Sequence, residues 1–139
     1  MKKRLKKLGI AVVIVCGILF AFAMYSSSEV PEDVKYIAVD SVEMYDELSA
    51  NAYSAEEKYS DMYVKIEGEI SVIDSDGEYI SLKVPSDKYW LESILCNFTE
   101  DEQKEILKDK TIGDTVIIEG QISEIGEILG YSVDIHTIE

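Results

Sequence analysis

Two segments of the chain share one ten-residue pattern built around a glycine. Residues 64 to 73 read VKIEGEISVI and residues 116 to 125 read VIIEGQISEI, so the pattern returns after fifty-two positions. In the first copy apolar and polar side chains alternate, as in a strand that buries one face and exposes the other. In the second copy Val116, Ile118, Gly120 and Ile122 keep the same period of two. A glycine in mid-strand has no Cβ and permits a sharp bend or a bulge. The sequence therefore predicts two curved strands, with Gly68 and Gly120 as paired corner residues.

A hairpin and a third strand are predicted between these two segments. Asp76-Gly77 is a typical hairpin turn, and the apolar alternation over residues 80 to 84 predicts a returning strand. A third strand is predicted over residues 91 to 98. The turn sequence from Asp74 to Glu78 resembles part of a calcium loop, but its glycine stands fourth instead of sixth. No metal site is therefore predicted there.

The order of the remaining elements identifies a fold. Thr99 with Glu102 is a capping-box signal for a short helix after the third strand. The second glycine segment follows, and a last strand is predicted after Gly130. Five antiparallel strands with a helix between the third and the fourth match the OB-fold, a partly open Greek-key barrel. In such a barrel the first and fourth strands are neighbours, which explains why the pattern occurs twice. The predicted fold class is mainly β.

An amphipathic helix is predicted in front of the barrel. Asp40 and Glu43 form an N-cap signature, and Asn51 marks a position where the helix can bend. Apolar residues then recur every three or four positions. They are Val42, Tyr45, Leu48, Ala52, Ala55 and Tyr59.

The N-terminal sequence predicts a membrane segment. An uncharged run of 18 residues, Leu8 to Tyr25, follows the basic start MKKRLKK, and a helix of this length spans about 27 Å. Lysines before the run keep its start in the cytoplasm, so we expect a single-pass anchor with the remaining chain outside. The alternative is cleavage near Ala23, which would release a secreted protein. Lipidation of Cys16 is disfavoured, because that chemistry needs a small residue where Val15 stands.

Three parts follow from these signals. Residues 1–25 are a signal-anchor or signal peptide, residues 26–36 are a polar linker, and residues 37–139 are the helix plus OB-fold domain. After the first seven residues the chain has eight lysines and no arginine against all 28 acidic residues. A field of that sign repels phosphate backbones, so nucleic acid is disfavoured as a partner.

Four segments of the chain form a recognisable combination. They are N-A-Y-S-A-E-E-K-Y at residues 51 to 59, then V-K-I-E-G-E-I, and later C-N-F and G-D-T-V-I-I-E-G. This combination resembles the tRNA_anti-like family. Its most specific element here is Asn51, Ala55 and Tyr59, four residues apart, leading into the first strand. The resemblance covers about Val39 to Ile138. The members of this family are largely uncharacterised bacterial OB-fold proteins, and a signal or membrane segment often precedes the OB domain. The resemblance therefore implies an OB-fold for this chain. The family name records likeness to anticodon-binding domains.

The chain departs from this family in its last predicted strand. Where the family would have a cysteine, His136 stands, so a disulfide from Cys96 to that strand is excluded. Cys96 and His136 could approach each other across the third and fifth strands. A nucleophile also needs a base and an orienting group, and a metal needs further ligands at fixed spacing. Neither is visible, so we predict no catalytic residue, no metal and no cofactor, and interpret Cys96 as a small buried thiol.

Three aromatic residues are the candidate ligand-binding residues. Tyr79, Tyr89 and Trp90 lie on or near the second and third predicted strands, which form the face that OB domains commonly use. Single-strand binders combine such aromatics with a basic groove, and here only Lys83 and Lys88 are near. The alternative for Trp90 is that it packs over an end of the barrel.

Two functions follow from these observations. The first is a non-catalytic, membrane-tethered OB-fold module outside the cytoplasm that binds an envelope protein, a peptide or a glycan. The second is a single-stranded nucleic-acid-binding OB domain, which location and charge oppose.

Overall fold

The computed structural model describes residues 30–139. The predicted membrane segment, residues 8–25, and the first part of the predicted linker lie outside this range. Within it, no helix combines the length and the apolar character needed to cross a membrane. In chain order, with η for 3-10 helices, the elements are β1 (Ile37–Ala38), α2 (Ser41–Ala50), α3 (Ala52–Tyr59), β2 (Tyr63–Ile73), β3 (Tyr79–Lys83), η1 (Asp87–Tyr89), β4 (Ser93–Phe98), η2 (Asp101–Asp109), β5 (Thr115–Gly126) and β6 (Gly130–Ile138).

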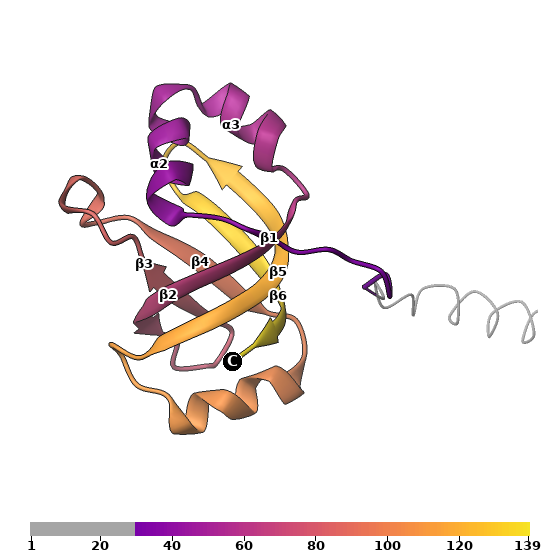
Figure 1. Cartoon of the computed structure of the whole chain (residues 1–139). Helices are drawn as coiled ribbons and strands as arrows, with labels where there is room; N and C mark the ends of the chain where they lie inside the picture. Colours follow the sequence, from indigo (N-terminus) through magenta and orange to yellow (C-terminus); the bar gives the residue numbers. More distant parts are fainter. Residues whose placement is uncertain (1–29) are drawn as a thin grey trace, which may run out of the picture. The chain divides into compact units, whose positions relative to one another are not determined.

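Strands β2 to β6 form a closed barrel (Figure 1). Their order is β2-β3-β4-β6-β5, and β5 pairs back onto β2, while β1 adds a short parallel edge to β2. This order confirms a mainly β, five-stranded barrel of the OB type. The expectation that every strand would be antiparallel was wrong. Strand β6 runs parallel to β4, because the chain crosses over through η2 and β5 before it returns.

The two glycine segments are neighbours, as β2 and β5 (Figure 1). Their antiparallel register centres on the pair Ile66 and Ile118 and places Gly120 opposite Val64. The predicted adjacency of the two strands is therefore confirmed. The glycines themselves do not face each other as paired corners, because antiparallel pairing carries Gly68 to the other side of the central pair.

Helices α2 and α3 lie at one end of the barrel (Figure 1). The predicted cap of α2 is confirmed, since Asp40 Oδ1 accepts a hydrogen bond from the Glu43 backbone at 2.9 Å. Two helices replace the single one that was predicted. Asn51 has an extended backbone and caps α3 by accepting from the Ser54 backbone at 3.1 Å. Ala55 of α3 is buried in the core.

Tyrosine side chains attach these helices to the barrel. The hydroxyl of Tyr45 donates to the Ser93 carbonyl, and that of Tyr131 donates to the Met44 carbonyl, both at 2.8 Å. The rings of Tyr59 and Tyr131 meet edge to face with centroids 5.7 Å apart. Since buried tyrosines contribute both apolar area and a directed hydrogen bond, this end of the barrel is firmly positioned.

The helix between β4 and β5 is a 3-10 helix, η2, and lies at the opposite end of the barrel from α2 (Figure 1, orange). The predicted cap at Thr99 and Glu102 was wrong by one residue. Glu100 is the N-cap, and its backbone N–H donates to Gln103 Oε1 at 3.2 Å. The hydroxyl of Thr99 instead donates to the Ile135 carbonyl at 2.9 Å, which ties this residue to β6.

Candidate functional site

The outer surface of β3, β4 and β6 is built largely from small polar side chains. Core-facing residues such as Ile80, Cys96 and Val133 alternate along these strands with residues that face outward. The register aligns the outward residues in two rows across the sheet. We call this surface the polar face, and it consists of Tyr79, Ser81, Leu95, Asn97, Ser132 and Asp134, together with Ser123 of β5.

Asp134 is the centre of hydrogen bonding on the polar face. Its Oδ1 accepts from Asn97 Nδ2 at 3.2 Å and from Ser123 Oγ at 3.0 Å. These bonds hold the side chains of three strands in fixed positions. Asn97, Ser123 and Asp134 offer an amide, a hydroxyl and a carboxylate for hydrogen bonding, beside the half-buried ring of Tyr79. Ser81 and Ser132 are buried beneath them.

Positive charge is scarce on this surface. All eight lysines that follow residue 7 lie within the described residues, and five of them form ion pairs with carboxylates. Lys83 is the single lysine on β3, β4 and β6. Exposed ion pairs add little stability, but each one lowers the local positive potential that an anionic ligand would need.

A hollow of about 660 Å³ lies where the polar face reaches the hairpin between β5 and β6. Ser123 and Ser132 of the polar face line it, and Glu56 of α3 and Ser60, the C-cap of that helix, line it from the helix side. The hairpin tip, which we define as Glu127 to Leu129, forms the rest of the wall together with the strand ends. This volume is in the usual range of ligand pockets.

A second hollow, of about 430 Å³, lies between the same tip and α2. Tyr45 and Leu48 of α2 line it together with Glu92, Glu127 and Ile128. The tip thus separates two hollows, and both are bordered by helices that precede the barrel in the chain.

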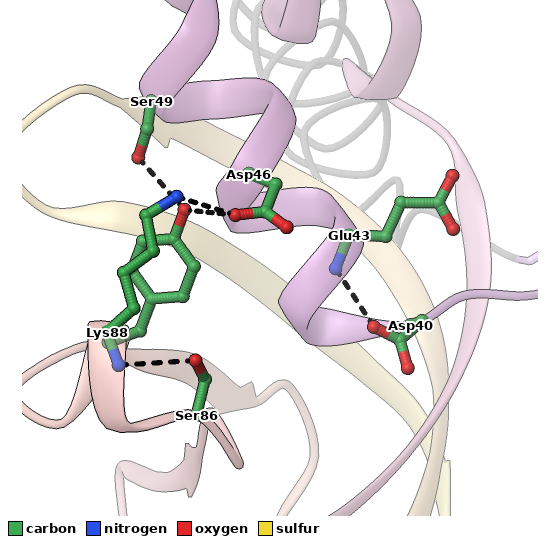
Figure 2. Close-up of polar contacts among 7 residues, drawn as sticks. Asp40, Glu43, Asp46, Ser49, Ser86 and Lys88 are labelled. Atoms are coloured by element: carbon green, nitrogen blue, oxygen red, sulfur yellow. Dashed lines mark hydrogen bonds and ion pairs between the residues drawn. The ribbon is translucent and has the colours of Figure 1, made fainter.

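Tyr89 has no exposed ring face to offer a ligand, because only 4% of the residue is accessible. Its hydroxyl donates to Asp46 Oδ1 at 2.6 Å, and its ring lies 5.5 Å from that of Tyr45. Lys88 reaches the same carboxylate oxygen at 2.8 Å (Figure 2). The Lys88 ammonium, with the Tyr89 hydroxyl, lowers the pKa of Asp46. Tyr89 therefore attaches η1 to α2.

Trp90 is on the surface, with 71% of the residue accessible. It does not pack over an end of the barrel, which was the alternative interpretation. Trp90 lies in the turn after η1, and this turn is the reason why β4 begins at Ser93 and not at the predicted Leu91. Tyr79 is at the far end of β3 from that turn. The structure therefore does not bring the three predicted aromatic residues together, and a binding role for Tyr79 and Trp90 stays a prediction.

Cys96 and His136 face opposite sides of the sheet. Cys96 is completely buried beside Val133, and burial raises the pKa of its thiol. His136 is on the outer surface, where its Nδ1 is 2.9 Å from the Tyr36 hydroxyl and its ring contacts that of Tyr63. The approach that the sequence left open does not occur. In the part of the chain that the structure describes, no three His, Cys, Asp or Glu side chains are grouped to hold a metal.

Sequence reasoning missed the tip and most of the polar face. The tip had a readable signal, because Ile128 and Leu129 are two apolar residues in a turn framed by Gly126 and Gly130. The polar face had none, since its short polar residues come from strands far apart in the sequence. Only the register shows that they lie in adjacent rows.

No protein-family model and no curated protein matches the chain. Among solved structures, a lipoprotein of Klebsiella pneumoniae described as a candidate nucleic acid-binding protein is similar, at 14% identity and a TM-score of 0.56, over 75% of this chain and 90% of that one. Replication protein A of U. maydis, bound to single-stranded DNA, gives 14% identity and a TM-score of 0.46 over 75% of this chain and 70% of its own. The hypothetical protein YgiW of E. coli gives 18% identity and a TM-score of 0.43, over 76% and 89%.

At these identities, similarity shows a shared fold and nothing finer. The Klebsiella lipoprotein alone has a TM-score above 0.5 among these three, so it carries the comparison. The fold that this lipoprotein shares with the chain agrees with the OB-fold assigned from the strand order. The likeness to the tRNA_anti-like family remains a resemblance.

Proposed function

We propose that the chain is a non-catalytic binding module, anchored in the cell membrane by residues 8–25, whose OB-fold domain binds a protein or peptide of the cell envelope outside the cytoplasm. The observation that carries this proposal is the charge of the candidate site. The polar face and the hollow beside it contain Asp134, Glu56, Glu124 and Glu127, against Lys83 at the edge. Such a surface suits an uncharged or cationic partner.

Binding of nucleic acid depends on a different surface. Non-specific affinity comes from lysine and arginine side chains that replace condensed counterions along the phosphate backbone. A single-stranded ligand on the polar face would instead meet the carboxylate of Asp134, which lies on β6 between β4 and β5. Five of the eight lysines that follow residue 7 already have carboxylate partners elsewhere.

Single-stranded nucleic acid is the second candidate ligand because one observation favours it. The similar Klebsiella lipoprotein is described as a candidate nucleic acid-binding protein, and OB-folds bind oligonucleotides as well as oligosaccharides. The half-buried ring of Tyr79 on the polar face would then serve as a stacking platform.

A titration separates the two candidates. Trp90 is the single tryptophan and is exposed, so its fluorescence reports on ligands that bind near the helices. We expect no change in fluorescence or anisotropy when labelled oligo-dT is added to the full-length chain in neutral nanodiscs at 50 and 200 mM salt. Micromolar binding that weakens steeply with salt would replace the proposal with the nucleic-acid function.

Location is tested separately. A protease added to intact cells should digest the domain, and carbonate should leave the anchor in the membrane pellet. Recovery of the chain in the cytosol would contradict the proposed location, and a soluble product that begins near Met24 would establish cleavage.

A further inference from the structure

We infer that the hairpin tip, with the hollows on its two sides, is the docking site for a partner peptide segment in which apolar side chains are flanked by lysine or arginine. The inference rests on the proposed binding function and adds where the partner binds and which chemistry it has. Four features of the described residues support it: exposure, rigidity, shape and charge.

The first feature is exposure of apolar surface. Ile128 and Leu129 are 89% and 84% accessible, the highest values among the large apolar residues that the structure describes. Turns normally carry polar residues, and this one has Gly126 and Gly130 at its ends. Exposed apolar side chains that contribute nothing to the core indicate an interaction surface when they cluster. A turn that only joined two strands would not need them.

The second feature is rigidity. Gly130 has a φ of 74° and packs so closely against Tyr45 that an added Cβ would overlap the tyrosine hydroxyl. The next residue, Tyr131, is fully buried and donates to the Met44 carbonyl at 2.8 Å. The tip therefore extends from a base that is locked to α2. A partner that binds there loses little affinity to the ordering of the loop.

The third feature is shape. Ile128 lines both hollows, of about 660 and 430 Å³, so a segment that crosses the tip can place side chains on either side of it. Glu92 borders the second hollow, and it follows the exposed pair Trp90 and Leu91 directly. The turn after η1, which carries this exposed apolar pair, therefore borders the second hollow at Glu92.

The fourth feature is charge. Glu56, Glu92, Glu124 and Glu127 line the two hollows, and no lysine, arginine or histidine among residues 30–139 does. Among the described residues, none of these four carboxylates has an ion-pair partner within 4.0 Å. An apolar surface surrounded by these four carboxylates repels phosphates, anionic membranes and a second copy of itself. It complements a segment with basic residues beside its apolar ones.

A labelled decapeptide of alternating leucine and lysine is the probe. It is titrated against the full-length chain in nanodiscs of phosphatidylcholine, with empty nanodiscs as the blank. We expect micromolar affinity that falls as salt rises. Replacement of every lysine by glutamate in the peptide should abolish binding. Equal affinity of the glutamate peptide, or no binding of the lysine peptide, would overturn the inference.

Variants locate the site. The double variant Ile128→Ser/Leu129→Ser should weaken binding at least tenfold, and Glu124→Gln/Glu127→Gln about fivefold with a smaller salt dependence. Ile112→Ser is the matched control, because Ile112 is also an exposed apolar residue, at 67%, but lies in the turn before β5. It should bind like the parent. Unchanged circular dichroism shows that each variant is folded, and a tip variant that binds like the parent would overturn the inference.

Crosslinking in intact cells distinguishes failure of the inference from failure of the proposed function. A photoreactive amino acid is placed at position 129 in one strain and at position 79, on the polar face, in another. An envelope protein captured at 129 by the parent but not by Glu124→Gln/Glu127→Gln supports the inference. Capture at 79 alone would leave the proposed function and overturn the docking site. Capture at neither position would contradict both.

Discussion

The two glycine segments have almost the same sequence but very different surroundings. At Gly68 of β2, an added Cβ would lie 3.2 Å from the Cβ and Cδ1 of Leu82, a close contact with a side chain. At Gly120 of β5, it would overlap the carbonyl oxygen of Asp134 and lie 2.8 Å from Val133 Cγ1. The contact at Gly68 is tight and involves one side chain, whereas the overlap at Gly120 includes a backbone carbonyl.

The sheet register explains the difference. Strand β5 shifts its register against β6 between Glu119 and Gly120, so the second glycine is part of a bulge. In β2 the shift against β3 falls between Ile70 and Val72, beyond Gly68. A repeated pattern thus identifies two neighbouring curved strands without showing where the backbones come closest. That depends on the partner strand, β6 for one copy and β3 for the other.

The largest expected effect is that of Gly120→Val. Because the new Cβ would meet a backbone carbonyl in a closed barrel, β5 and β6 must separate locally. We expect a loss of about 3 kcal/mol in the free energy of unfolding. Urea titration of residues 30–139, followed by circular dichroism, measures it. A loss below about 1 kcal/mol would show that the bulge accommodates a side chain, and Gly120 would then not differ from Gly68 in its requirement for glycine.

Gly68→Val should cost less, about 1 kcal/mol, since a shift of a few tenths of an ångström relieves the contact with Leu82 and valine favours strands. The same titration applies, and Gly68→Ala is the matched smaller substitution, with an expected effect of a few tenths of a kcal/mol. Equal losses for the two valine variants would mean that curvature, and not local crowding, sets the requirement for glycine at both positions.

The comparison also shows what the sequence could predict. Alternation at Ile66 and Ile118, together with the hairpin signal at Gly77, was enough for the strands, their order and the pairing of β2 with β5. These features depend on local periodicity and on the rule that the first and fourth strands of an OB-fold are neighbours. Cap positions were less accurate, because Thr99 bonds to β6, a contact between residues 36 positions apart.

The candidate site was much harder to predict. Tyr89 and Trp90 are adjacent and both aromatic, yet one is buried against Asp46 and the other is exposed. The sequence around these two residues does not show which of them is buried, because their difference in burial depends on where α2 packs. The apolar tip at Ile128 is visible in the sequence, but the hollows beside it exist only once α3 and α2 are placed.

A smaller effect is expected at the ion pair that joins the two segments. Lys65 of the first copy and Glu119 of the second lie 3.2 Å apart and are partly exposed. Exposed pairs of this kind contribute about 0.2 to 1 kcal/mol. We expect a double-mutant cycle with Lys65→Met and Glu119→Gln to give a coupling energy in that range, reduced at 1 M NaCl. Coupling that does not respond to salt would indicate a packing contact instead.

The smallest expected effect is a pH dependence of stability, and it arises on β6 at the bulge beside the second glycine segment. At its bulge Glu119 pairs with Thr137 and Gly120 with Ile135, so His136, the single histidine of the chain, is the extra residue on β6. Burial lowers its pKa, an effect that the Asp134 carboxylate partly offsets. The folded state therefore takes up this proton less readily than the unfolded state does, and stability rises with pH across that interval.

The contribution of His136 should thus be fully present above its unfolded pKa of about 6.5 and be lost as pH falls below it. Carboxylates also titrate in this range, so the parent is compared with His136→Asn, which keeps a hydrogen-bonding group near the Tyr36 hydroxyl. Between pH 7.5 and 5.0 the parent should lose slightly more stability than the variant. The expected difference is small because the ring is half-exposed and solvent screens its charge. An NMR titration that placed the folded pKa of His136 above 6.5 would reverse the sign, and the bulge would then favour the protonated ring.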